Sequence, residues 1–263
     1  MSQPRIQRPF FRRGPDYRFG ENQSFADVRN QFALAGVKVG AWVTKEEQYT
    51  AANLVFDALA DLAWVMKVPP QTLGLRGQLQ LAFGTRGQRH AQAHYEPATR
   101  ILALAKNAGA GALAHEFWHA FDHHIAGKLY LDAGPWQLAS HLWLERDCYQ
   151  PHPLNDKLTR LFATVLLSAD SNKPSDYMYR AMALDEQRQS LYFSQPTELM
   201  ARAFEAWVQD NGEVTNHYLV SGTKQSEAAR QGAFPEGAHR RQCASAFASY
   251  FTALGQALSG ASI

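Results

Sequence analysis

The chain has 263 residues, of which 46% are hydrophobic, and this is enough to form a substantial core in one large domain or two small ones. The formal net charge is only +2, which excludes a nucleic-acid-binding surface that spans the whole protein. Residues 1–23 are nonetheless basic, and we expect a flexible, solvated tail, or alternatively a contact with nucleic acid or a partner, through Arg5, Arg8, Arg12, Arg13 and Arg18.

No apolar run reaches the length of a signal-peptide core or of a membrane span. Cys148 and Cys243 stand far apart in unrelated contexts, which argues against a disulfide framework and against a thiolate metal cluster. We therefore expect a soluble, cytoplasmic protein without a membrane contact, and the sequence predicts no particular oligomeric state.

The first half of the chain contains both helix and strand patterns. Residues 24–43 indicate a short helix followed by a strand. Thr44 and Glu47 have the spacing of a capping box, and apolar residues then recur at helical intervals as far as Pro69, so a core helix is predicted here. Short runs of alternating polarity, joined by a turn at 96–99, next predict antiparallel strands at 78–84, 90–96 and 100–106.

The second half is mainly helical, with helical patterns at 136–146, 154–168, 196–208 and in a last stretch that ends near Leu258. Strands and helices do not alternate regularly, so we predict an α+β protein with a small, mostly antiparallel sheet. We expect a single domain at 24–258, with a sheet-containing half to about 125, a helical half from about 126 and a flexible end at 259–263.

The segment 111–124, GALAHEFWHAFDHH, concentrates metal-binding residue types in a stretch of helical periodicity. Residues four apart lie one helical turn from each other, so His115 and His119 share a face and can bind one ion. Glu116 lies between them and is the candidate general base of an H-E-x-x-H zinc site. Asp122 is almost in line with His115 and is a candidate to fix an imidazole tautomer.

A catalytic zinc site needs a third protein ligand and one position open to water. The metzincin class would have a histidine at position 125, which is Ile, so that class is excluded. A helix predicted within SQPTELMARAFEAW, with Ser194 as its candidate N-cap, offers carboxylates instead. Glu198 is the leading candidate for the third ligand, and Glu205 is the alternative.

Several motifs, in this order, resemble those of one known family. They are VKVGAWVTKEE, the stretch from LAFG to FDHH at 81–124, YFSQPTELMARAFEAWV, NHYLV and AFPEGAHRRQCASAF. From about Phe32 to Phe251 the chain resembles the large polyvalent protein-associated domain 1 family. These are zincin-like modules of phage and mobile-element polyvalent proteins and of their bacterial relatives.

This resemblance implies a zincin-like metallopeptidase fold, with the helix of the H-E-x-x-H motif packed on the small sheet. It also implies a set of site residues, namely the ligands His115, His119 and Glu198 and the base Glu116. The chain departs from the family in Phe117–Trp118 within the motif and in His123–His124 after it, where small or polar residues are expected. We expect these departures to alter the cleft wall and to leave the ligands intact.

In the predicted mechanism, zinc lowers the pKa of a bound water toward about 7, and Glu116 transfers its proton to the leaving amine. The oxyanion needs a further donor, and Tyr192 and Tyr218 are candidates, with a structural role as the alternative for each. His94 is expected to be a strand residue. A strand at the sheet edge could pair with an extended peptide.

Three functions remain open from the sequence. The first is a zinc-dependent, gluzincin-type metallopeptidase that hydrolyses a protein or peptide substrate. The second is a catalytically silent zincin-like module that binds zinc or recognises a partner. The third is a phage- or mobile-element-derived accessory protein associated with nucleic acid. The intact Glu116 favours the first, because a structural zinc site has no use for a base.

Overall fold

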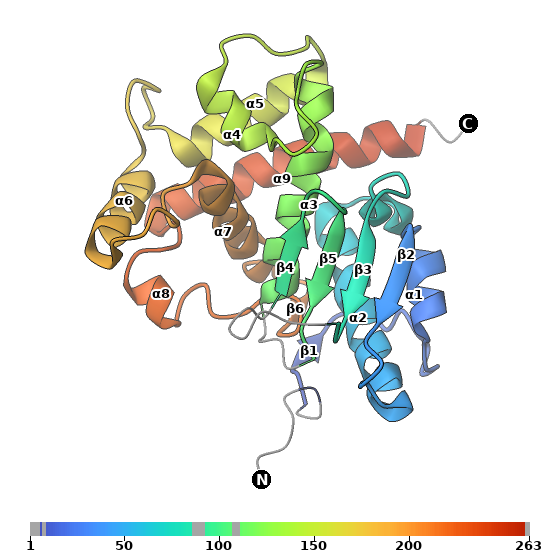
Figure 1. Ribbon diagram of the computed structural model, residues 1–263. Helices are drawn as coiled ribbons and strands as arrows, with labels where there is room; N and C mark the ends of the chain where they lie inside the picture. The colour runs from blue at the N-terminus through green and yellow to red at the C-terminus, as the bar shows by residue number, and fades with distance from the viewer. Residues whose placement is uncertain (1–5, 7–8, 86–92, 107–110, 261–263) are drawn as a thin grey trace.

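The computed structural model describes Ile6 and residues 9–85, 93–106 and 111–260. The helices are α1 (Phe25–Gln31), α2 (Lys45–Met66), η2 (Pro70–Gly74), α3 (Ala112–Leu129), α4 (Ala139–Glu145), α5 (Pro153–Leu166), α6 (Asp176–Arg188), α7 (Pro196–Gln209), α8 (Glu227–Arg230) and α9 (Gly237–Gly260). The strands are β1 (Arg12–Arg13), β2 (Gly36–Val39), β3 (Gln80–Phe83), β4 (Ala93–Glu96), β5 (Ile101–Leu104) and β6 (Thr215–Asn216). A small sheet thus occupies one side of the molecule and a group of helices the other, which confirms the α+β class (Figure 1).

The main sheet is mixed, and its strand order is β2-β3-β5-β4. β2 pairs with β3 and β3 with β5 in parallel, and only β4 runs antiparallel to its neighbour β5. The predicted mostly antiparallel sheet is therefore wrong, although the turn at 96–99 does join β4 to β5. The reason is that β5 lies between β3 and β4, and this insertion depends on tertiary pairing, which alternating polarity does not encode.

Helix α2 connects the parallel strands β2 and β3, as a parallel pair requires a crossover. Its start is the predicted capping box: Thr44 accepts from the amide of Glu47, and Glu47 accepts from the amide of Thr44. Its end is Lys67, which adopts a left-handed conformation before Pro69. The local sequence signals for this helix are thus confirmed at both ends.

One hydrophobic cluster takes side chains from both halves of the chain. Helix α3 runs through its centre, with the sheet on one side and α7 on the other (Figure 1). Trp118 is fully buried there, and its ring lies 5.1 Å from that of Phe204 on α7 and 5.3 Å from that of Phe247 on α9. This packing fixes α3 between the two halves of the protein.

The basic N-terminal segment is attached to α2 and β6 over its described part. β1 pairs with β6, and Arg12 forms an ion pair at 2.8 Å with Asp61, whose side chain is completely buried in α2. Arg18 forms a second ion pair with Asp57 at 2.9 Å. The expected solvated tail at 1–23 is therefore wrong for this part, because a buried carboxylate needs a counter-charge. Arg5 and Arg8 lie outside the described residues.

At the other end, α9 continues to Gly260, and residues 261–263 of the expected flexible end lie outside the described part of the chain. None of the helices in the described ranges has both the length and the apolar character of a membrane span.

Candidate metal centre

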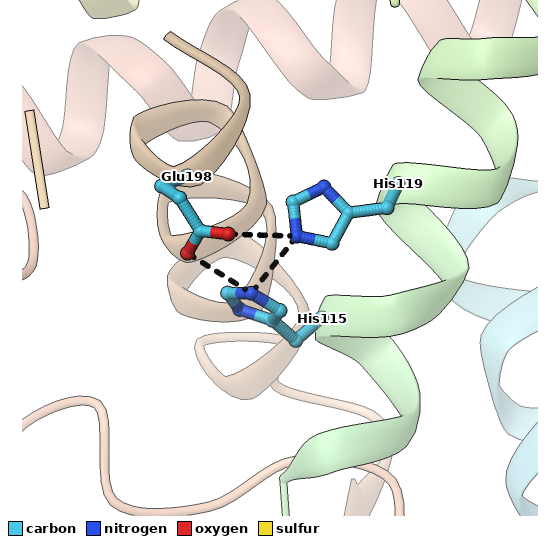
Figure 2. A group of neighbouring side chains, drawn as sticks. All are labelled: His115, His119 and Glu198. Atoms are coloured by element: carbon cyan, nitrogen blue, oxygen red, sulfur yellow. Dashed lines mark hydrogen bonds and ion pairs between the residues drawn. The ribbon is translucent and has the colours of Figure 1, made fainter. Parts of the chain in front are cut away.

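Helix α3 presents His115 and His119 toward α7 (Figure 2). The helix begins after Gly111, whose φ of +103° favours glycine. The face opposite the histidines is buried in the core, as predicted, through Leu113, Phe117, Ala120 and Phe121. Core packing thus sets the direction in which the two imidazoles point.

Glu198, in the first turn of α7, meets the two histidines (Figure 2). Its Oε2 lies 3.3 Å from His115 Nε2 and its Oε1 3.2 Å from His119 Nε2. The two Nε2 atoms are 3.1 Å apart. The structure therefore brings together the three residues predicted as ligands, in a group that could hold a metal ion.

The spacing of these three atoms fits a tetrahedral divalent ion. Ligand atoms at about 2.0–2.1 Å from tetrahedral zinc are about 3.3 Å apart from one another. The observed separations of 3.1, 3.2 and 3.3 Å agree with that value. Two imidazoles and one carboxylate are also a donor set that leaves one tetrahedral position for water.

Glu205 takes a different position from the one considered for it as an alternative ligand. Its Oε2 lies 3.0 Å from His115 Nδ1, on the side of the ring away from Glu198. In the neutral imidazole, Nδ1–H then donates to Glu205 and Nε2 keeps its lone pair for a metal. Burial lowers the pKa of His115, but the carboxylates of Glu205 and Glu198 outweigh burial and raise it to about 10. A metal ion must therefore displace a proton from this ring.

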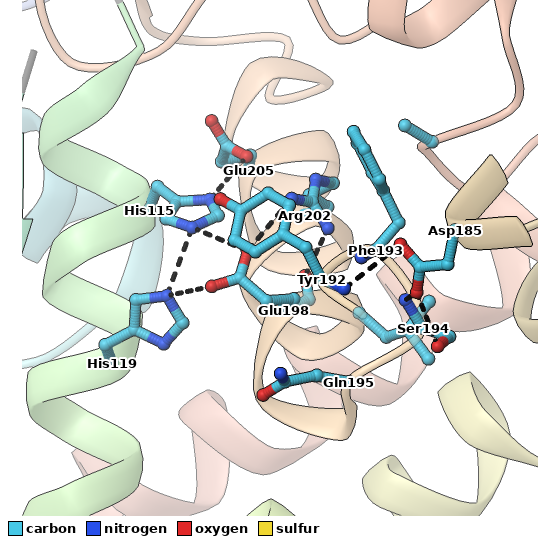
Figure 3. A network of polar contacts seen from close by, with 12 residues as sticks. His115, His119, Asp185, Tyr192, Phe193, Ser194, Gln195, Glu198, Arg202 and Glu205 are labelled. Carbon is cyan, nitrogen blue, oxygen red and sulfur yellow. Dashed lines mark hydrogen bonds and ion pairs between the residues drawn. The ribbon is translucent and has the colours of Figure 1, made fainter. Parts of the chain in front are cut away.

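Arg202 holds Glu198 from the side opposite the histidines. Its Nη2 donates to Glu198 Oε2 at 2.9 Å, and the side chain is only 6% exposed. The guanidinium contacts two neighbouring rings, 4.9 Å from the centroid of Tyr192 and 4.6 Å from that of Phe193 (Figure 3). Burial opposes ionisation of Glu198, but the two histidines hold its pKa well below the usual range. Glu198 is thus ionised, as a ligand must be.

Asp185, near the end of α6, fixes the turn that carries these rings. Its carboxylate accepts hydrogen bonds from the amides of Tyr192, Phe193 and Ser194 at 2.7–3.1 Å (Figure 3). Ser194 also donates its hydroxyl to Asp185, whereas Gln195 is the N-cap of α7, so the predicted cap at Ser194 is wrong. The Ser194 hydroxyl thus binds the buried carboxylate of Asp185 and does not cap α7.

Glu116 lies beside the edge strand of the sheet. Its Oε2 accepts a hydrogen bond of 2.6 Å from the backbone amide of Tyr95 in β4. The hydroxyl of Tyr95 lies 2.7 Å from Nδ1 of His123, which is about two helical turns after Glu116 on α3. β4 is therefore attached to α3 at two points, one of which is the candidate base. His94 lies in the same strand, paired with Ala103, as expected.

The two candidate tyrosines differ in position. Tyr192 lies next to the centre: burial and the neighbouring carboxylate of Glu198 raise its pKa. Tyr218 is buried with its ring 5.2 Å from that of Phe10, and its hydroxyl has no hydrogen-bond partner among the described residues. Only Tyr192 contacts the ligand network, so the geometry gives no support to Tyr218 as an oxyanion donor.

Two expectations about α3 are wrong, those for Asp122 and Trp118. Asp122 does not bind an imidazole; it is buried and accepts hydrogen bonds from the amide and hydroxyl of Ser140 at the start of α4. Trp118 packs in the core and is not part of a cleft wall. His123 binds Tyr95 and the carbonyl of Pro135, which ties a loop and a strand to the helix. Helical spacing places these residues on faces but does not identify the partners across each face.

The roles of Tyr95 and Asp185 were missed from the sequence. Tyr95 donates its own main-chain amide to Glu116, and Asp185 accepts from the main-chain amides of other residues. Contacts through main-chain amides do not depend on residue type, so they leave no pattern in the sequence. For Asp185, the only sequence signal is an acidic residue shortly before a predicted helix with aromatic residues nearby, and this signal indicates the contact only weakly.

Comparison with known proteins gives one family match. The family described as large polyvalent protein-associated domain 1 matches residues 184–258, which contain Glu198, Arg202 and Glu205. The match is shorter than the expected span from Phe32 to Phe251 and does not reach α3. No curated protein and no solved structure matches the chain. Residues 184–258 thus match the same family, the large polyvalent protein-associated domain 1, that the motifs of the chain resemble.

Proposed function

We propose that the protein is a zinc-dependent metallopeptidase with a zincin-like fold. The observation that carries this proposal is the meeting of His115, His119 and Glu198 at tetrahedral spacing, with Glu116 on the same helix. Glu205 supports it by fixing the tautomer that leaves His115 Nε2 free to bind a metal. Zinc is the ion that two imidazoles and one carboxylate with an open position favour.

When bound, zinc would act as a Lewis acid that polarises a peptide carbonyl and lowers the pKa of a water molecule. Glu116 would accept a proton from that water at its carboxylate and deliver it to the nitrogen of the leaving amine. Its present partner, the Tyr95 amide, holds the carboxylate at the sheet edge, and the charge of Glu116 is near enough to Tyr192 to help raise the pKa of that hydroxyl. Tyr192 would donate its hydroxyl to the oxyanion, because it borders Glu198.

The substrate in this proposal is a protein or peptide in an extended conformation. β4 is an edge strand of the main sheet, and its Tyr95 amide points away from β5 toward Glu116. An extended peptide can add to such an edge through main-chain hydrogen bonds. In doing so it would take the Tyr95 amide and release Glu116 for catalysis.

The second candidate is a zincin-like module that binds zinc without hydrolysis. The observation in its favour is that Glu116 is already occupied by a main-chain donor at 2.6 Å. An accessory role with nucleic acid through the N-terminal arginines has less support, because Arg12 and Arg18 are bound to Asp61 and Asp57.

Metal content and proteolysis of three proteins test the proposal. The parent and Glu116→Gln should each retain about one zinc per chain, whereas His119→Ala should lose it. The parent should cleave an unfolded protein mixture, and Glu116→Gln should cleave it at least about 100-fold more slowly, as removal of a general base predicts. If the parent and Glu116→Gln both retain zinc and neither cleaves the mixture, the result would favour the silent module. Absence of zinc from the parent would refute the metal centre itself.

A further inference from the structure

A group of basic side chains lies at the end of α3 and of the edge strand. It consists of Arg76, Arg100, His124 and Lys128, and we call it the basic surface. Arg76 lies in the loop before β3, Arg100 in the turn between β4 and β5, and the other two in the last turns of α3. Three separate segments thus bring the cations Arg76, Arg100 and Lys128 together beside His124, whose ring is uncharged at neutral pH.

The charges of this surface are not neutralised. Among the described residues, no carboxylate lies within ion-pair distance of Arg76, Arg100 or Lys128. The amide oxygen of Gln78 accepts hydrogen bonds from Arg100 and, at 3.1 Å, from His124. A neutral oxygen shared by two donors leaves the positive charges uncompensated.

The cations are close enough to perturb one another. Burial and the charges of Lys128, Arg76 and Arg100 lower the pKa of His124 to about 4. Burial and Arg76 likewise lower the pKa of Lys128. Like charges at such distances destabilise a fold, so the surface costs stability unless something anionic binds to it.

Both arginines also adopt a backbone conformation that is unfavourable for their residue type. Arg76 has φ of +60° and Arg100 has φ of +53°, in the left-handed region where glycine or asparagine is preferred. The chain therefore places long cationic side chains at two turn positions where a small residue would be less strained.

The basic surface continues the edge that the proposed substrate would use. Arg100 ends the turn that follows β4, and Tyr95 of β4 is bound to Glu116 and His123 on α3. From His119 to Lys128 the helix rises by about 13 Å, a distance that an extended peptide covers in about four residues. The nearby Glu96 is exposed, and its carboxylate accepts the amide of Ala98 without forming an ion pair.

We propose that the basic surface binds an acidic segment of the peptide substrate, about three to five residues from the bond that is cleaved. A peptide antiparallel to β4 enters from the Arg100 end, so these acidic residues lie on the N-terminal side of that bond. This inference rests on the proposed function, because it requires a peptide along β4. It adds a specificity-determining surface that is separate from the ligands.

A cleavage-site survey tests this inference. Peptides from a digested proteome are incubated with the zinc-loaded protein, and the cleaved bonds are identified by mass spectrometry. Asp and Glu should be enriched at the third to fifth residues on the N-terminal side. In the triple variant Arg76→Gln, Arg100→Gln, Lys128→Gln, cleavage of these peptides should fall about tenfold, the effect of a few exposed ion pairs, and cleavage of neutral peptides should not.

A matched control removes the same formal charge from exposed positions elsewhere. Arg160 on α5, Lys173 in the loop before α6 and Arg241 on α9 serve this purpose when each is changed to Gln. The control should keep the acidic preference. No acidic enrichment in the parent, or an equal loss in the control, would overturn the inference while leaving the peptidase intact.

Direct binding separates this inference from a failure of the peptidase proposal. Fluorescein-labelled hexaglutamate should bind zinc-loaded Glu116→Gln more tightly than hexaglutamine does. Adding the triple substitution should weaken hexaglutamate binding about tenfold, and adding the control substitutions should not. Equal binding of the two peptides would contradict the inference even if no substrate is cleaved. A different result would be that the three cations contribute to binding of a labelled single-stranded oligonucleotide and not to binding of hexaglutamate. In that case the ligand of the basic surface would be nucleic acid and not an acidic peptide.

Discussion

The two sides of the candidate metal centre are built in different ways. On α3, the histidines stand on a helix that is anchored in the core by the buried side chains of Phe117 and Trp118. On α7, Glu198 is held by polar and aromatic neighbours, with Arg202 bound to its carboxylate and in contact with the rings of Tyr192 and Phe193. One side depends on apolar packing, and the other on a network of charges and hydrogen bonds.

This difference predicts which properties each side controls. Loss of packing behind α3 should lower the stability of the whole protein, because the same side chains form the core. Loss of the network behind Glu198 should lower metal affinity with a smaller effect on stability, because it acts on one ligand. Substitutions on each side can therefore separate folding from metal binding.

The largest expected effect is that of Trp118→Ala. Trp118 is fully buried against Phe204 and Phe247, and its truncation should cost about 3–5 kcal/mol of unfolding free energy. Urea denaturation monitored by circular dichroism measures this loss. Trp136→Ala is the control, since Trp136 is 65% exposed and should change stability by less than about 0.5 kcal/mol. Equal losses of unfolding free energy in the two variants would contradict the conclusion that packing behind α3 stabilises the protein.

A smaller, more local effect is expected from Arg202→Met. Without the guanidinium, Glu198 loses its 2.9 Å hydrogen bond, and zinc affinity should fall about 10- to 100-fold. Competition with a chromophoric chelator measures the affinity. Arg188→Met is a matched control, because Arg188 stacks on the same Phe193 ring at 4.9 Å but has no contact with Glu198. If both variants bind zinc as the parent does, the network does not position the ligand.

The pH dependence of zinc binding sharpens the comparison further. The pKa of His115 is raised to about 10, so the metal-free ring is protonated at neutral pH and must release that proton on binding. Between pH 7 and 8, each added pH unit should strengthen zinc binding about tenfold, and this gain should end as the pH passes the raised pKa. Calorimetry in buffers of different ionisation enthalpy should detect release of about one proton. Release of none would show that Glu205 and Glu198 do not hold a proton on this ring.

The sequence predicts the α3 side of the centre better than the α7 side. His115 and His119 follow from helical spacing, and Glu198 from an acidic helix with Pro196 in its first turn, because both signals are local. Arg202 stacks on rings that Asp185 positions from another helix. That arrangement depends on the turn at 192–194 folding back onto Asp185, and the spacing of residue types does not encode this.

The same limit explains the sheet and the N-terminal segment. The positions of the strands follow from alternating polarity, but the insertion of β5 between β3 and β4 is a tertiary choice. Arg12 looks like a solvated charge in the sequence, and its partner Asp61 looks like one polar residue of a long helix. Pairing two such distant charges requires the folded chain.

The proposed function requires that one zinc ion binds between α3 and α7. Anomalous diffraction at the zinc absorption edge, from crystals of the zinc-loaded protein, tests it most directly. We expect one strong peak with His115 Nε2, His119 Nε2 and a carboxylate oxygen of Glu198 at about 2.0–2.2 Å. A peak at another location, or none between these three side chains at full zinc loading, would contradict it.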